Sequence, residues 1–267
     1  MSFKSKVLAI AATLTLVGGV GLAGATGTAS AATPSCGPLC VNIYNQQFPA
    51  KSFLIDVFRQ KQAVGQPVIL FRTSNSDPAL DWSVSEEGTV SDFFDIGLVS
   101  AEVMLHYGCT PGLVFTNGTG GTFTCAANTA DEVAGEIQYA PYGVDSGLCM
   151  GVASKALPAV GSASVSLQPC GTEAGTIWIL DGVDVCNNFS FGEAPLINGA
   201  DTNFSLPSVL TYPANAYPTD VPRPQLVVKN LTGFSQNGPP SPNPSGCQSI
   251  AAADTSQLWS AFLGLAA

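Results

Sequence analysis

The feature that most constrains this chain is an internal pattern that occurs three times along its length. Each copy contains two short, mainly apolar runs separated by a turn, followed by a tryptophan. The runs are residues 53–57 and 67–71 before Trp82, 148–152 and 164–167 before Trp178, and 208–212 and 225–228 before Trp259. One unit of about four strands cannot close a core by itself, whereas three packed units can. The repeat therefore predicts an all-β fold with the three tryptophans in a shared core.

The copies cover approximately residues 41–90, 136–182 and 206–262, and long insertions separate or interrupt them. These insertions are residues 91–135, 183–205 and 235–253. The chain has few charged residues and many Gly and Pro residues, which favours short strands joined by turns over helices. We expect the insertions to be surface loops, and loops of this length can carry function or serve only as padding.

The N-terminus has the form of an export signal, with Lys4 and Lys6 before an apolar run and a small-residue cleavage site at Ala29-Ser30-Ala31. We predict a signal peptide at residues 1–31 and a single secreted, extracellular domain at 32–267, with no later membrane span. Loss of the two lysines takes the net charge from −10 to −12. Nucleic-acid binding is therefore not expected, because proteins that bind nucleic acid use clustered Lys and Arg residues to neutralise the phosphates.

Eight cysteines in an exported chain predict disulfide bonds, because the thiols leave the reducing cytosol. A metal site is not expected, since no Cys-x-x-Cys pair occurs and His106 is the single histidine. No cofactor motif is present either, because the glycines at 118, 120 and 121 lie in a Thr- and Asn-rich turn and do not open a helix.

Several of these landmarks resemble the ricin-type β-trefoil lectins, whose repeats each end in Gln-x-Trp. Gln257-Leu258-Trp259 keeps the triplet complete, whereas Leu80-Asp81-Trp82 and Thr176-Ile177-Trp178 keep only the tryptophan. Gly88-Thr89-Val90 is similar to the Gly-Thr-Ile turn that follows the first tryptophan in many of these lectins. The resemblance covers about half of residues 32–267. It implies a β-trefoil of three pseudo-repeats with long, disulfide-tied insertions.

The resemblance also implies one disulfide within a repeat, between Cys149 and Cys170, with Ile55 and Arg72 to Thr73 at the corresponding places of copy one. For the other six cysteines, pairing in sequence order is the simplest arrangement, and other connectivities stay open. The predicted pairs are Cys109–Cys125, Cys186–Cys247 and Cys36–Cys40.

A carbohydrate site is the function that the resemblance implies. Ricin-type sites use an aspartate to accept hydroxyl hydrogen bonds, an aromatic ring to stack on the sugar, and a nearby amide. In copy one these are Asp56, Phe71 and Asn75. Elsewhere the residues are lost: Gly151 and Thr211 replace the aspartate, Gln168 replaces the ring of copy two, and in copy three Pro224 or Gln225 lies near a wholly different loop.

Catalysis is not expected. A Ser-His-Asp triad would need His106, which lies beside apolar residues, and Ser146 does not sit in a Gly-x-Ser-x-Gly elbow. The acidic group formed by Glu86, Glu87, Asp92, Asp95 and Glu102 has the character of a solvated turn, although a pair of carboxylates could in principle serve a glycosidase. We therefore predict a non-catalytic recognition protein that binds carbohydrate. The alternative is an inhibitor-like or toxin-subunit-like trefoil that binds an extracellular protein partner, and a secreted hydrolase ranks last.

Overall fold

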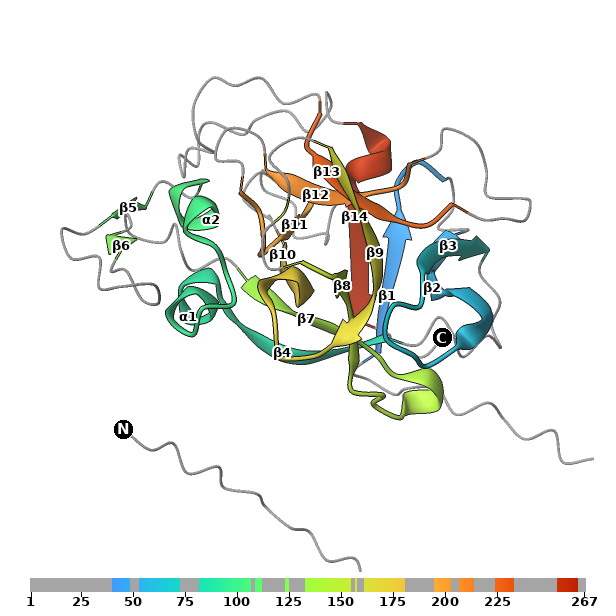
Figure 1. Cartoon of the computed structure of the whole chain (residues 1–267). Coiled ribbons are helices and arrows are strands. Elements are labelled where there is room, and N and C mark those ends of the chain that lie inside the picture. Colours follow the sequence, from blue (N-terminus) through green and yellow to red (C-terminus); the bar gives the residue numbers. More distant parts are fainter. Residues whose placement is uncertain are drawn as a thin grey trace, which may run out of the picture. The chain divides into compact units, whose positions relative to one another are not determined.

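A computed structural model shows an all-β fold (Figure 1). Within the part of the chain that the structure describes, twelve strands are joined in one sheet and two short α-helices occur. The structure describes residues 40–48, 53–72, 82–106, 109–111, 123–124, 133–154, 157, 161–180, 195–202, 207–213, 224–232 and 254–263. The predicted export signal at 1–31 lies outside them. Among the described residues no helix has the length and apolar character needed to cross a membrane.

The twelve strands fall into three successive sets of four. The first set is β1 (Cys40–Asn45), β2 (Phe53–Val57), β3 (Val68–Arg72) and β4 (Trp82–Thr89). The second set is β7 (Val133–Tyr139), β8 (Leu148–Val152), β9 (Ser162–Pro169) and β10 (Ile177–Leu180). The third set is β11 (Leu196–Asn198), β12 (Ser208–Thr211), β13 (Val227–Asn230) and β14 (Trp259–Leu263).

The three sets repeat the same strand register. In each set the second and third strands form an antiparallel hairpin, and the second residue of that hairpin pairs with the penultimate residue of the set's first strand. These equivalent pairs are Tyr44 with Leu54, Gln138 with Cys149, and Ile197 with Val209. Because moving a register by one residue turns every side chain to the other face, the agreement shows that the sets are structural copies. The arrangement is trefoil-like.

Each tryptophan also links its own copy to the next one. Its pairing partner is the last residue of the following copy's first strand: Trp82 pairs with Tyr139, Trp178 with Asn198, and Trp259 with Asn45. The last of these pairs joins the C-terminal strand β14 to β1, as Figure 1 shows. The copies are therefore connected in a cycle. In addition, strands β7, β8, β9, β13, β12, β11 and β10 pair successively and return to β7, which closes a barrel of seven strands.

The indole nitrogens make the same hydrogen bond in all three copies. Each donates to the backbone oxygen of the third residue in its own copy's second strand, at 3.0 Å for Trp82 to Ile55, 2.8 Å for Trp178 to Met150 and 2.8 Å for Trp259 to Leu210. All three rings are buried in one apolar core, as the repeat predicts. The bond satisfies the single polar atom of a ring that otherwise contributes buried apolar area.

A second apolar core lies on the other face of the barrel strands. Helices α1 (Val90–Asp95) and α2 (Ala101–His106) belong to the predicted insertion 91–135, together with the two-stranded ladder of β5 (Thr110–Pro111) and β6 (Phe123–Thr124). Phe93 and Met104 of the helices join Ile177 and Ile179 of β10 in this core. Trp178, between those two isoleucines, points into the first core, so the strand is buried on both faces.

The main strands predicted from the repeat are confirmed, but three details differ. The third copy begins with β11 at Leu196, inside the segment 183–205 that was predicted to be an insertion, because a strand of three residues leaves too little periodicity to detect. Similarly, β7 begins at Val133, within the predicted insertion 91–135. The register places Leu54, and not Ile55, at the position of Cys149. Gly65 and Gly161 occupy their hairpin turns with positive φ, as turn glycines often do.

We predict that phenylalanine in place of Trp82, Trp178 or Trp259 lowers the free energy of unfolding by about 1–3 kcal/mol in each case, because a buried carbonyl oxygen loses its donor. The three losses should be similar, since the three bonds are equivalent. Urea unfolding monitored by circular dichroism measures them. Val144→Ala, at a side chain that is 67% exposed, is the control and should change stability by less than about 0.5 kcal/mol. One tryptophan variant with wild-type stability would contradict the equivalence.

Candidate functional site

Two of the three predicted sugar-site residues lie on one face of the β2–β3 hairpin. Asp56 pairs with Ile69 and Leu54 pairs with Phe71, so Asp56 and Phe71 are diagonal neighbours on the same side of the ladder. The opposite side carries Ile55 and the other residues that enter the first core. The predicted aspartate and aromatic ring are thus brought together by the fold, on the side of the hairpin that faces away from that core.

Their exposure differs. The Asp56 side chain is 4% exposed, whereas Phe71 is half-buried. Asn75, the predicted amide, lies outside the described residues. A ligand at this face would therefore meet the ring of Phe71 more readily than the carboxylate of Asp56.

The common register identifies the equivalents of these residues in the other copies. Gly151 and Thr211 occupy the position of Asp56, as the sequence predicts. Gln168 pairs with Cys149 and so occupies the position of Phe71 in copy two, which is also as predicted. In copy three Lys229 pairs with Val209 and so occupies the position of Phe71, which the sequence did not reveal.

The glutamine of the complete Gln-x-Trp triplet is used inside the protein. Gln257 is 1% exposed and ends the short 3₁₀ turn η8 (Thr255–Gln257) before β14. Its amide nitrogen donates to Thr211 Oγ1 at 3.1 Å and to the backbone oxygen of Asn230 at 3.0 Å. Its oxygen accepts from the backbone nitrogen of Thr232 at 2.8 Å and from the Thr232 hydroxyl at 2.9 Å. Gln257 therefore ties β12, β13 and β14 together.

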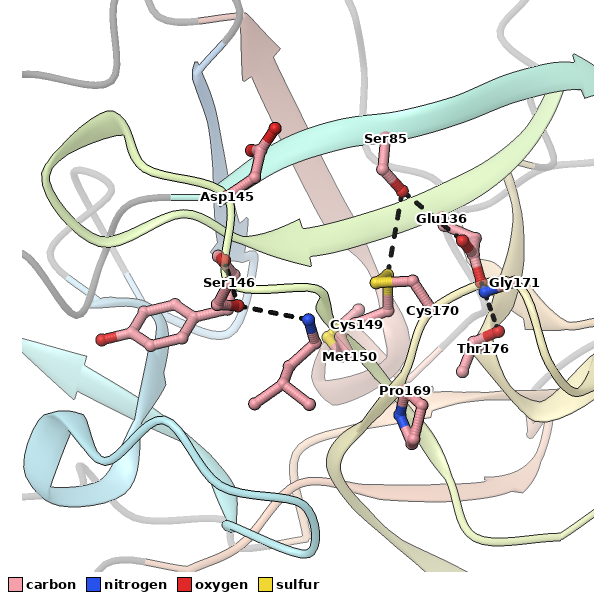
Figure 2. The surroundings of a disulfide bond; sticks show 12 residues. Ser85, Glu136, Asp145, Ser146, Cys149, Met150, Pro169, Cys170, Gly171 and Thr176 are labelled. Carbon is pink, nitrogen blue, oxygen red and sulfur yellow. Dashed lines mark hydrogen bonds between the residues drawn. A yellow bond between two sulfur atoms is a disulfide. The ribbon is translucent and has the colours of Figure 1, made fainter.

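The disulfide predicted within copy two is confirmed (Figure 2). Cys149 and Cys170 have sulfur atoms 2.04 Å apart and Cα atoms 5.1 Å apart. Cys109 is also disulfide-bonded, and Cys125, its predicted partner, lies outside the described residues. The predicted pairs Cys36–Cys40 and Cys186–Cys247 involve side chains outside the described part of the chain and stay predictions.

A buried glutamate beside this disulfide was not predicted from the sequence. Glu136, on β7, is 1% exposed. Its Oε1 accepts from the backbone nitrogen of Gly171 at 2.7 Å and from Thr176 Oγ1 at 2.6 Å, and its Oε2 accepts from Ser85 Oγ at 3.5 Å (Figure 2). The signal that could have revealed it is a single acid within a strand that is otherwise apolar or neutral. Charged side chains are rarely fully buried unless paired or hydrogen-bonded.

The donor atoms at this point do not make a metal site. Glu136, Cys149 and Cys170 hold their potential ligand atoms within 4.8 Å of one another. However, the two sulfur atoms are bonded to each other, and metal binding by cysteine requires thiolates. Glu136 acts instead as a clamp, because it holds the segment after β9 and the 3₁₀ turn η6 (Ala174–Thr176) against β7.

Two of the groups considered for catalysis, Ser146 and Asp92, have structural partners. Ser146 donates from Oγ to the backbone oxygen of Tyr139 at 2.5 Å and accepts from the backbone nitrogen of Leu148 at 3.2 Å, so it shapes the β7–β8 turn. His106 ends α2. Asp92 caps α1 together with Thr89, and hydrogen bonds from the Thr89 backbone and side chain lower the pKa of its carboxyl.

Comparison with known proteins adds little. No family model matches the chain, and no curated protein sequence matches it. Among solved structures that align with it is the "Crystal structure of designed 3-fold symmetric protein, ThreeFoil", at 11% identity and a TM-score of 0.42, over 83% of this chain and 96% of the other. Such a TM-score is too low to support an assignment, so the threefold pattern rests on the strand register and hydrogen bonds of this chain.

We predict that Glu136→Leu lowers the free energy of unfolding by about 2–4 kcal/mol, because the Gly171 N–H and the Thr176 hydroxyl lose a buried acceptor. Glu136→Gln should cost only about 1 kcal/mol, since its amide oxygen can stay in place of Oε1 and its NH₂ can donate to Ser85 Oγ. Urea unfolding measures both. The exposed Glu87→Gln is the control. Equal losses for the leucine and glutamine variants would show that Glu136 is not a hydrogen-bonding clamp.

Proposed function

We propose that the chain is a ricin-type β-trefoil that acts outside the cell as a non-catalytic recognition protein for carbohydrate, through copy one. The observation that carries this proposal is the register of the β2–β3 hairpin. It puts Asp56 and Phe71 on one face of the ladder. These are the two residues that the resemblance assigns as the aspartate and the aromatic ring of a sugar site.

The chemistry of the pair is suited to a sugar. A carboxylate accepts hydrogen bonds from hydroxyl groups, and an aromatic face packs against the C–H groups of a pyranose ring. Phe71 is half-buried, so part of its ring is available for such a contact. The equivalent pairs in the other copies, Gly151 with Gln168 and Thr211 with Lys229, lack both groups.

The extracellular location is proposed from the sequence and supported by the disulfide. Residues 1–31 have the pattern of an export signal, and Cys149 and Cys170 are joined. Disulfides form and persist mainly in oxidising compartments. The excess of negative charge, which is −12 after loss of Lys4 and Lys6 from the full chain's −10, helps a protein with few charged residues to stay in solution.

A glycan array tests the proposal. Wild-type protein should bind a defined set of glycans, and Phe71→Ala and Asp56→Asn should each weaken binding by about tenfold or more, as expected from the loss of one stacking or charged hydrogen-bond contact. Asparagine is chosen because Asp56 is buried and alanine could disturb the hairpin. Asp95→Asn, at an exposed carboxylate, is the matched control. An array without signal, or variants that bind like wild type, would overturn the proposal.

A second candidate function is favoured by the insertion that contains α1 and α2. This segment has a core of its own against the barrel, yet Ile96, at its turn, is 65% exposed. An apolar side chain at the tip of an ordered insertion is suited to contact with a protein partner. In this case the trefoil is a scaffold, and the 4% exposure of Asp56 is structural.

Pull-down from spent culture medium distinguishes this candidate. Wild-type bait should recover one protein in stoichiometric amount, and Ile96→Asp should abolish the recovery without changing the melting temperature, because the side chain is at the surface. Val64→Asp, at a residue 60% exposed on the β2–β3 turn, is the matched control and should leave recovery unchanged. Recovery that is equal for both variants would contradict a role for this tip.

A further inference from the structure

We propose that copies two and three are closed by packing, so that the chain binds at most one carbohydrate per molecule, at copy one. The number of ligands rests on the proposed function, whereas the closure of the two copies is a property of the fold alone. It concerns the position that Asp56 occupies in copy one, which is held by Gly151 in copy two and Thr211 in copy three.

In copy two the backbone itself fills the position. A Cβ atom added to Gly151 would lie 2.7 Å from the backbone oxygen of Gly175 and 3.1 Å from Thr176 Cα. The approach is mutual, since a Cβ on Gly175 would lie 2.4 Å from the backbone oxygen of Val152. Turn η6 therefore rests directly on β8. An aspartate at residue 151 would not restore a site, because even its first side-chain atom does not fit.

Turn η6 is held in this place from several sides. Thr176 Oγ1 donates to Glu136 on β7, and the Gly175 oxygen accepts from Asn198 Nδ2 at 3.0 Å. The disulfide joins β8 to Cys170, the residue directly after β9, and the next residue, Gly171, donates to Glu136. These bonds link η6 to two strands and β8 to the segment before η6, so opening this copy for a ligand would require breaking several buried contacts.

In copy three, side chains occupy the position. The Thr211 hydroxyl donates to the backbone oxygen of Val209 at 3.0 Å and accepts from Gln257. Gln257 has both amide hydrogens and its oxygen engaged with the protein, so it has no donor left for a sugar hydroxyl. Lys229, at the ring position, is exposed and has no flat apolar face on which a sugar could stack.

Copy one differs at the same place, because it accommodates the whole side chain of Asp56 where copy two does not accommodate a Cβ. It is also the one copy with an aromatic residue at the ring position. A chain with this single position would bind a glycan without cross-linking it, unlike a lectin with several sites.

Melting temperatures test the closure without a ligand. Gly151→Ala should lower the melting temperature by roughly 4–10 °C, as overpacking against a fixed backbone does. Gly88→Ala is the matched control, because a Cβ there would meet its nearest atoms at 3.4 Å, an ordinary contact. It should change the melting temperature by less than about 2 °C. Equal melting temperatures for Gly151→Ala and Gly88→Ala would overturn the closure of copy two.

Thr211→Val tests copy three and keeps the side-chain shape, so the protein should fold even if Gly151→Ala does not. We expect a decrease of roughly 3–8 °C, because Gln257 loses a buried partner. The exposed Thr172→Val is the control. A melting temperature equal to that of the control would show that the Thr211 hydroxyl is available to a ligand, which would overturn the closure of copy three.

Calorimetric titration with lactose and with xylotriose then measures the number of sites. One sugar bound per chain, lost in Asp56→Asn, supports the proposal, whereas two or three per chain, or binding that survives in Asp56→Asn, overturns it. If neither sugar binds while Gly151→Ala and Thr211→Val are destabilised, the closure of the two copies stands and the result counts against the proposed carbohydrate function. Failure of the closure hypothesis and failure of the proposed carbohydrate function would therefore give different results.

Discussion

The structure depends on the position of each tryptophan at a junction between two copies. The indole nitrogen bonds to the second strand of its own copy, and the backbone of the same residue pairs with the first strand of the next. Each tryptophan therefore joins the strands of its own copy and also positions that copy against the next one. Because Trp259 in β14 pairs with Asn45 in β1, the third copy is joined back to the first.

Buried polar groups place the turns around this cycle. Asn45 and Asn198 are equivalent residues, and each donates its amide to the 3₁₀ turn of the preceding copy, at Ser256 and Gly175. Glu136 and Gln257 hold the same turns from within their own copies. Such groups are costly unless fully bonded, so they favour one arrangement of the turns over others. In this arrangement the backbone of η6 lies against Gly151 in copy two, and Gln257 is bonded to Thr211 in copy three.

More of the fold than of the candidate site could be predicted from the sequence. Trp82, Trp178 and Trp259 in a common core, and the bond between Cys149 and Cys170, were predictable because the repeat places equivalent residues at equivalent spacings. Strand β11 was not, since Leu196 to Asn198 is too short to show alternation. The residue at the ring position of copy three, Lys229, emerged only from the register, because the segment between β12 and β13 is longer than the corresponding segments of the other copies.

By itself the sequence determined that the chain consists of three strand-rich copies with tryptophans inside, because side-chain periodicity and repeat spacing are local properties that survive divergence. Only the tertiary structure decided which faces remain accessible. Glu136 contacts Thr176 across 40 residues, and Gly151 approaches Gly175 although strand β9 lies between them in the sequence. These contacts depend on how closely the backbones approach after packing, and this distance cannot be inferred from a local pattern of residue types.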